Sequence, residues 1–112
     1  MNMILAFLPP HRVDPVARML QRLEGFPGMT VTEARGHGHE KVTDEQDSRA
    51  QMTDFTPTMR LETIVRDSLV EPVIAAIFEA AHTGSRGDGK VYVLPVSDAL
   101  RIKTGTRGES AV

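Results

Sequence analysis

The protein has 112 residues, the length of a single domain, and its 40% hydrophobic and 25% charged residues match an ordinary soluble globular protein. A formal net charge of −2 gives no electrostatic attraction for nucleic acid, and the absence of cysteine excludes disulfides, thiolate metal sites and cysteine nucleophiles. No apolar run approaches the roughly 18 residues that span a bilayer, and no secretory signal is recognisable, so we expect a cytoplasmic protein without membrane insertion.

The first third of the chain predicts a strand, a helix and a second strand. Met3–Leu8 is a short apolar run that Pro9 stops, which is typical of a strand. Asp14-Pro15 is the pattern of a helix N-cap, and Gly25 is placed to end that helix. Apolar residues recur between them at helical spacing: Val16, Met19, Leu20 and Leu23. The β-branched residues within Met29–Arg35 favour another strand.

The middle of the chain, residues 39–54, is polar and has no hydrophobic period, so it predicts a long flexible loop. Long loops are uncommon in compact domains and often carry function. Asp44, Glu45 and Asp47 lie within this loop. Because nothing in the sequence would hold these carboxylates rigidly, we interpret them as a solvated segment rather than an acid–base pair.

The last part of the chain repeats the pattern of strand, helix and strand. Met59–Val65 predicts the third strand, and Val91–Val96 predicts the fourth. Between them, Ser68 and Glu71 form a capping-box pattern, with Pro72 in the expected first turn. The apolar stripe that follows predicts the second helix.

This order of elements predicts an α+β, ferredoxin-like βαββαβ fold, with two helices on one face of an antiparallel sheet and one domain over residues 1–112. We expect the polar tail from Lys103 onward to be loosely held. The second face of the sheet would leave a half-apolar surface in water, which a partner subunit could cover. We expect four residues on that surface: Thr30, Val31, Thr63 and Ile64.

The segment Gly84–Lys90 is the strongest candidate for a functional site. Its three glycines allow the backbone to approach a ligand and to aim several N–H groups at one point, and Lys90 adds a positive charge. Arg101 and Lys103, on one side of an extended segment, could add two more charges, which would suit a polyphosphate. The same segment also suits a plain glycine-rich turn with exposed basic residues, and its spacing is not that of a Walker A loop.

His37, His39 and Glu40 form a candidate metal site. Two histidines and a carboxylate can bind a metal, and residues two apart in a strand share one face. Because the spacing fixes no further ligand, we favour two solvated histidines at the mouth of the loop.

Several of these segments together resemble the PII signal-transduction proteins. The resemblance runs in register over nearly the whole chain, from Met1 to Val112, and four motifs follow one another in the family's order. These motifs are Gly28-Met29-Thr30-Val31-Thr32-Glu33 with Gly36-His37-Gly38, Asp54-Phe55, Thr83-Gly84 with Gly87-Asp88-Gly89-Lys90, and Arg101-Ile102-Lys103-Thr104-Gly105.

The resemblance implies a homotrimer of ferredoxin-like protomers that regulates other proteins and is not an enzyme. It implies that ATP and ADP, with or without Mg, compete for clefts between subunits, and that the loop at 39–54 docks onto a target such as a membrane transporter. Residues 87–90 would surround the phosphates, and Arg101 and Lys103 would pair with them from the adjacent subunit. The adenine pocket would be lined by Thr30, Glu62 and Ile64. The implied nucleotide-binding residues are Gly28, Thr30, Gly38, His39, Glu40, Glu62, Ile64, Gly87, Asp88, Gly89, Lys90, Arg101 and Lys103.

The sequence departs from the nitrogen-sensing members of this family. Glu40 stands where a glutamine helps to hold Mg-ATP and 2-oxoglutarate, and a carboxylate there would repel the dianion. Thr58 replaces a lysine that pairs with 2-oxoglutarate, and Ser85 replaces a basic residue beside the phosphates. Residues 39–54 also lack the tyrosine that is modified in enteric relatives. We therefore expect nucleotide binding to be retained and 2-oxoglutarate binding to be weak or absent.

The stretch from His37 to Lys41, and a tail ending in Arg107-Gly108-Glu109, are similar to PII-like proteins encoded beside heavy-metal efflux pumps, which would make such a pump the target. A regulator of nitrogen, bicarbonate or carbon metabolism is an alternative within the same family. Outside it, the alternatives are a metal-binding trimer with a ferredoxin-like fold and a slow ATPase, although the sequence positions no general base for hydrolysis.

Overall fold

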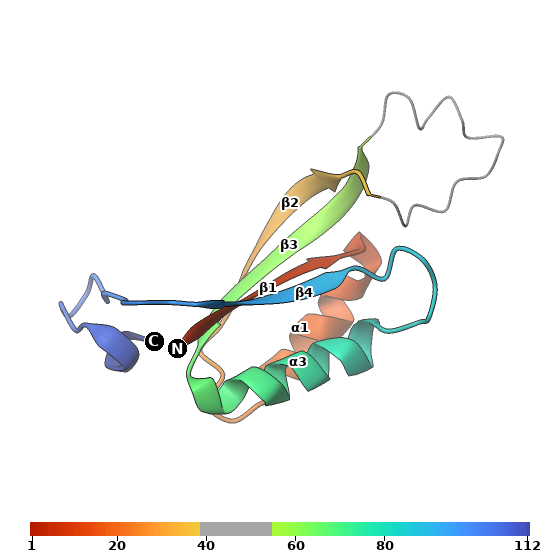
Figure 1. The fold of residues 1–112 in the computed structure, drawn as a ribbon. Helices are drawn as coiled ribbons and strands as arrows, with labels where there is room; N and C mark the ends of the chain where they lie inside the picture. The colour runs from red at the N-terminus through yellow and green to blue at the C-terminus, as the bar shows by residue number, and fades with distance from the viewer. Residues whose placement is uncertain (39–54) are drawn as a thin grey trace, which may run out of the picture.

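The computed structural model describes residues 1–38 and 55–112, which form the βαββαβ arrangement that the sequence predicts. Four antiparallel strands make one sheet in the order β2-β3-β1-β4 (Figure 1). The strands are β1 (Asn2–Leu8), β2 (Thr30–Gly36), β3 (Thr56–Val65) and β4 (Lys90–Pro95). The fold class is therefore confirmed as α+β and ferredoxin-like.

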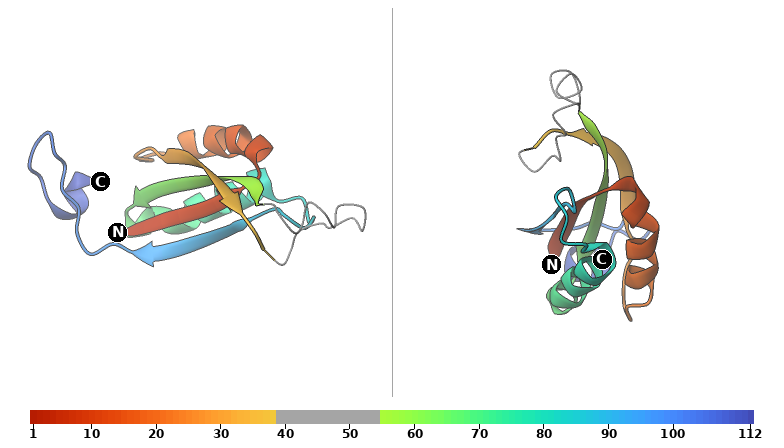
Figure 2. Two further views of the ribbon diagram at one scale, coloured as in Figure 1. Left: turned by 90° about the horizontal axis from the view of Figure 1, so that it is seen from above. Right: turned by 90° about the vertical axis from the view of Figure 1, so that its right-hand side faces the viewer.

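Two helices, α1 (Val13–Gln21) and α3 (Asp67–Ala81), pack against each other on one face of the sheet (Figure 2). Because side chains alternate along a strand, every second residue of β1 and β3 points at these helices. The buried core between the sheet and the helices consists of Ile4, Ala6, Leu8, Val16, Leu20, Leu61, Val65, Val73, Ala76, Ile77 and Ala81. Within the described ranges, no helix is long and apolar enough to cross a membrane.

Both helices begin earlier than their predicted caps. A 3-10 turn at Pro10–Arg12 leads directly into α1, so Asp14 lies in the first turn rather than at the N-cap. In α3, the helix is already under way at Ser68, and Pro72 lies past the first turn. Neither helix has a side-chain capping hydrogen bond at its N-terminus, so the two predicted caps were wrong. The hydrophobic spacing still located both helices, because packing of the apolar face contributes more to helix stability than the N-terminal cap does.

The other face of the sheet carries a continuous apolar surface, which we call the open face. The register of the strands places alternate residues of β1, β3 and β4 next to one another on it. On β4, Tyr92 is 47% exposed and Leu94 is 39% exposed. The apolar side chains of β1, the strand between β4 and β3, are half-buried. The apolar residues of the open face are Met3, Leu5, Phe7, Ile64, Tyr92 and Leu94.

Two of the four residues predicted for this surface lie on it, and two do not. Thr30 pairs with Glu62, and Ile64 pairs with Met3, which places them on the open face. Val31 instead packs against the core, and Thr63 is only 3% exposed on the helix side. The prediction did not use strand parity, which separates neighbouring residues onto opposite faces.

The tail is an ordered structure and not the loosely held segment that its polar sequence suggested. Residues 98–108 form a hairpin, which we call the tail hairpin, closed by a bridge between Leu100 and Arg107 and by the amide of Arg101 donating to the carbonyl of Thr106 (2.9 Å). A 3-10 helix at Gly108–Ala111 follows it. The hairpin projects from the body at the end where both termini lie (Figure 1).

Candidate functional site

The loop from residue 82 to residue 89, which we call the glycine loop, joins α3 to β4 and is built around the carboxylate of Asp88. Its Oδ2 accepts hydrogen bonds from the backbone N–H groups of Thr83 (2.8 Å) and Gly84 (2.9 Å). Its Oδ1 accepts a bond from the hydroxyl of Thr83 (2.5 Å), and that hydroxyl oxygen accepts the amide of Ser85 (3.1 Å). Asp88 therefore braces the loop from inside.

These hydrogen bonds hold the pKa of Asp88 below its ordinary value of 3.8, and the hydroxyl of Thr83 is the largest cause. His82, whose Nδ1 lies 3.8 Å from Oδ2 of Asp88, lowers this pKa further by attraction of opposite charges. Partial burial acts in the opposite direction and is outweighed. The carboxylate is therefore ionised at neutral pH and can accept all of these bonds.

Gly89 fixes where the loop meets the sheet. Its φ of +104° lies in the region that favours glycine, and a Cβ built on it would lie 1.9 Å from the carbonyl oxygen of Phe7. Because the backbone passes this close to β1, no side chain fits at position 89. The close approach sets Lys90 opposite Phe7, at the start of β4 and on the open face.

A second cation lies in the same row of the sheet. Arg60 of β3 pairs with Phe7 from the other side, and its guanidinium carbon is 5.9 Å from the centre of the Phe7 ring. Nε of Arg60 also donates to Oε1 of Glu62 (2.5 Å). Lys90 and Arg60 therefore flank Phe7 at the end of the open face nearest the glycine loop, and the charge of Arg60 is paired with Glu62.

A hollow of about 630 Å³ lies at the opposite end of the sheet, and we call it the strand hollow. Four of its lining residues are among the nucleotide-binding residues that the resemblance implies: Gly28, and the three expected to line the adenine pocket, Thr30, Glu62 and Ile64. Thr63 holds this wall in place, since its buried hydroxyl donates to the carbonyl of Gly28 (2.6 Å). Residues from the tail, among them Asp98 and Val112, complete the lining.

The predicted site residues fall into separate groups in the protomer. Gly87 to Lys90 lie together in and after the glycine loop, while the four residues of the strand hollow form a separate group that runs from Glu62 in the middle of β3 towards the other end of the sheet. Arg101 and Lys103 lie on the tail hairpin, where residues 102–104 form a turn, so the argument that two residues of an extended segment share one side does not apply to them. Gly38 is exposed beyond the end of β2, and His39 and Glu40 lie outside the described residues.

The candidate metal site lies partly within and partly outside the described residues. His37 stacks edge-on against Phe55, with ring centroids 6.2 Å apart, and its two proposed partners lie outside the described residues. Within residues 1–38 and 55–112, no group of three or more histidine, aspartate and glutamate side chains could hold a metal ion.

Sequence reasoning missed several residues that shape these sites. Thr63 was expected on the open face, whereas its pairing with the buried Ile4 places it on the helix side. Arg60 was overlooked, and strand parity with Glu62 was the available signal. Asp98 accepts hydrogen bonds from the amides of Ala99 (2.8 Å) and Gly108 (3.2 Å) and from the guanidinium of Arg107, a set of contacts that no local pattern announced.

Known proteins that are similar to this chain share one family name. The family model for nitrogen regulatory protein P-II matches residues 1–106. Relatives named nitrogen regulatory protein P-II from Azospirillum brasilense and Haemophilus influenzae are each 43% identical over 113 residues, covering all of both chains. A crystal structure of Arabidopsis thaliana PII bound to citrate is similar with a TM-score of 0.80 and 38% identity, over 99% of this chain and 91% of that one. The chain therefore belongs to the P-II family of nitrogen regulatory proteins.

Proposed function

We propose that this protein is a regulatory subunit that binds ATP or ADP in clefts between neighbouring copies of a homotrimer. The observation that carries the proposal is the glycine loop, which Asp88 braces and Gly89 presses against β1, with Lys90 at its exit. A fixed loop of this kind can aim backbone N–H groups at one point without reorganising, and a lysine beside it can neutralise phosphate charge. Membership of the P-II family supports the same assignment.

The distance between the two groups of residues supports a site shared between copies. In one protomer the glycine loop lies at one end of the sheet, whereas the strand hollow extends from Glu62 in the middle of β3 towards the other end, and we propose that a nucleotide uses the glycine loop of one copy and the strand hollow of the next. A neighbouring copy that brought its strand hollow to this protomer's glycine loop would complete the site. The open face, with Tyr92 47% exposed, supplies an apolar surface that such a neighbour would cover.

We further propose that the second ligand of nitrogen-sensing relatives, 2-oxoglutarate, binds weakly or not at all. The hydroxyl of Thr58 donates to the carbonyl of Leu8 (3.1 Å), and position 58 offers no cation to a carboxylate. Glu40 adds a negative charge at the base of the segment 39–54. Calorimetry with 2-oxoglutarate in the presence of Mg-ATP tests this, and tight binding would contradict it.

The regulatory output is proposed to run through residues 39–54, which would bind a target protein differently in the ATP and ADP states. Such linkage requires the two nucleotides to favour different states of the segment. A membrane transporter or a metal efflux pump is our proposed target, and the cytoplasm is our proposed location. Asp88 accepts hydrogen bonds inside the loop, which supports a structural role for it rather than that of a general base in hydrolysis.

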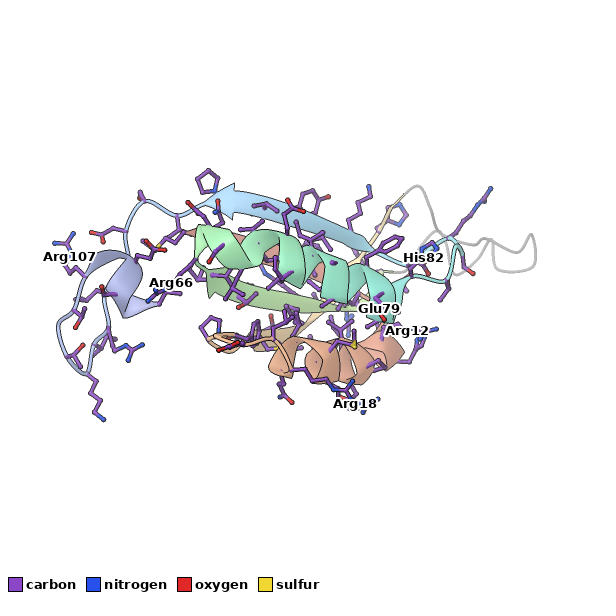
Figure 3. All side chains as sticks on the ribbon, turned by 90° about the horizontal axis from the view of Figure 1, so that it is seen from below. Arg12, Arg18, Arg66, Glu79, His82 and Arg107 are labelled. Carbon is purple, nitrogen blue, oxygen red and sulfur yellow. The ribbon has the colours of Figure 1, made fainter. Side chains whose placement is uncertain are left out.

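The decisive experiment is calorimetry of ADP binding to the wild-type trimer and to Lys90→Ala. We expect Lys90→Ala to weaken ADP binding at least about tenfold, the scale of one lost charge-assisted contact. Arg18→Ala is the matched control, because Arg18 is an exposed cation on α1, away from the glycine loop (Figure 3). Unchanged ADP affinity in Lys90→Ala would refute the assignment of the phosphate site.

A further inference from the structure

The tail hairpin is held in one conformation, yet it presents an apolar side chain to water. Asp98 ties the hairpin together through Ala99, Arg107 and Gly108, and Ile102 at its tip is 93% exposed. A single exposed isoleucine is ordinary on a protein surface and by itself indicates nothing. Ile102, however, stands between Arg101 and Lys103, the two cations that the proposed phosphate site takes from a neighbouring copy. Wherever those two side chains bind, Ile102 must be accommodated as well.

The glycine loop has an apolar hollow on the side that faces the helices. This hollow, which we call the loop groove, has a volume of about 300 Å³. Apolar side chains of α3 and β4 form its floor, and Asp88, Gly89 and Lys90 form its rim. Phe78 stands at the groove with 62% of its surface exposed, and its ring stacks on His82 with centroids 4.5 Å apart. The glycine loop is thus a wall shared by the proposed phosphate site and the loop groove.

The tail hairpin and the loop groove of one chain cannot meet. Arg107 marks the hairpin and His82 marks the groove, and they lie at opposite ends of the molecule (Figure 3). Only a second copy can therefore bring Ile102 to the groove. The loop groove borders the glycine loop, which Arg101 and Lys103 of the neighbouring copy are proposed to reach. A tail hairpin that places these two cations at the glycine loop also brings Ile102 to the rim of the loop groove.

We propose that Ile102 of each copy docks into the loop groove of the next copy, against Phe78, and thereby seats Arg101 and Lys103 beside the neighbour's glycine loop. This inference rests on the proposed function, because it supplies the contact that positions the borrowed cations. The two surfaces that meet are different, so the contact is heterologous and closes only if the copies form a ring. In a trimer, three such contacts complete the ring.

Cross-linking tests the contact directly, because the chain contains no cysteine of its own. The full-length double variant Ile102→Cys with Phe78→Cys is treated with a short bifunctional maleimide in the absence of nucleotide and analysed under denaturing conditions. We expect covalent dimers and trimers and nothing larger. The control pair combines Ile102→Cys with Arg18→Cys, on the outer face of α1 (Figure 3), and should give only background linkage. Linkage no greater than in this control, linkage that stops at the dimer, or a ladder beyond the trimer would each overturn the inference.

A second measurement covers the energetics and separates this inference from the proposed function. Ile102→Ser should weaken ADP binding about tenfold, whereas Ile102→Val, which keeps an apolar side chain, should change it little. Phe78→Ala should have an effect like that of Ile102→Ser, and the double variant should lose no more than either single variant, because both remove one contact. Glu79→Ala, the exposed neighbour on α3, is the control for the groove side. Additive losses would contradict the contact. Cross-linking without any ADP binding would refute the proposed function alone, and ADP binding without cross-linking would refute the inference alone.

Discussion

Gly89 gives the sharpest test of how the glycine loop is built. In Gly89→Ala, the new Cβ would lie 1.9 Å from the carbonyl oxygen of Phe7, about half an ordinary contact distance. A non-glycine residue at a φ of +104° also costs about 1–2 kcal/mol in backbone strain. Relief of the clash by shifting the loop or β1 adds about 1–3 kcal/mol, as overpacking of a filled site does. The sum, about 2–5 kcal/mol, is a large part of the stability of a small domain.

Gly87→Ala isolates the clash from the backbone strain. Gly87 has a similar φ of +87°, but a Cβ there would meet nothing within 4 Å. Thermal unfolding of both variants at one protomer concentration should show Gly89→Ala unfolding several degrees below Gly87→Ala, since 1 kcal/mol corresponds to about 4–8 °C in a domain near this size. Equal melting temperatures for the two variants would refute the argument that β1 and the loop are in forced contact.

Three further predictions concern the groups that hold the two halves of the site. Asp88→Asn should speed hydrogen exchange at the amides of Thr83 and Gly84 at neutral pH, because the carboxylate that accepts their hydrogen bonds is lost. Since the pKa of Asp88 is lowered in the folded state, the carboxylate's contribution to loop stability is fully present above its ordinary pKa of 3.8, and in the wild type it should be lost only as the pH falls through the folded pKa. Protection of the wild-type loop that declines nearer pH 6 would contradict this prediction. Thr63→Val should destabilise the fold by about 1–3 kcal/mol in denaturant unfolding, because the carbonyl of Gly28 loses its buried donor, and an unchanged midpoint would show that this bond is replaceable. Asp98→Asn should leave the global melting temperature nearly unchanged but raise hydrogen exchange across the tail hairpin, as the groups it joins are exposed; a large drop in melting temperature would mean that the hairpin supports the core.

The strands and helices could be predicted from the sequence because apolar residues recur with a different period in a strand than in a helix. The apolar faces defined by these periods are the faces that pack in the folded chain. It placed β1 and β4 within one or two residues of their observed bounds. It misjudged the tail because tail order comes from Asp98, whose partners Arg107 and Gly108 lie nine and ten residues away and follow no helical or strand period. Polar composition alone cannot distinguish such a braced hairpin from a mobile end.

The candidate site was also only partly predictable from the sequence. The glycine loop could be predicted as a unit, because its residues are consecutive in the sequence. The strand hollow could not be predicted from pattern alone, because Gly28 and Glu62 meet only through the pairing of β2 with β3. The resemblance to PII proteins supplied those residues, since it carries information about register that periodicity lacks. That the two groups are separate in one protomer became visible only in the folded chain.

This arrangement also gives a physical reason for the proposed combination of retained nucleotide binding and weak or absent 2-oxoglutarate binding. The shape of the proposed phosphate site depends on the backbone: the carboxylate of Asp88 organises the loop, and Gly89 has no room to change without moving β1. Substitutions there would disturb the fold of the loop itself. Thr58 offers 2-oxoglutarate no charge, while its hydroxyl is satisfied by the carbonyl of Leu8, so position 58 can exchange a cation for a small polar residue without leaving a group unpaired. The proposed nucleotide half is thus tied to the folding of the loop, whereas the proposed loss of the second ligand concerns a side chain, at position 58, that can vary without leaving a group unpaired.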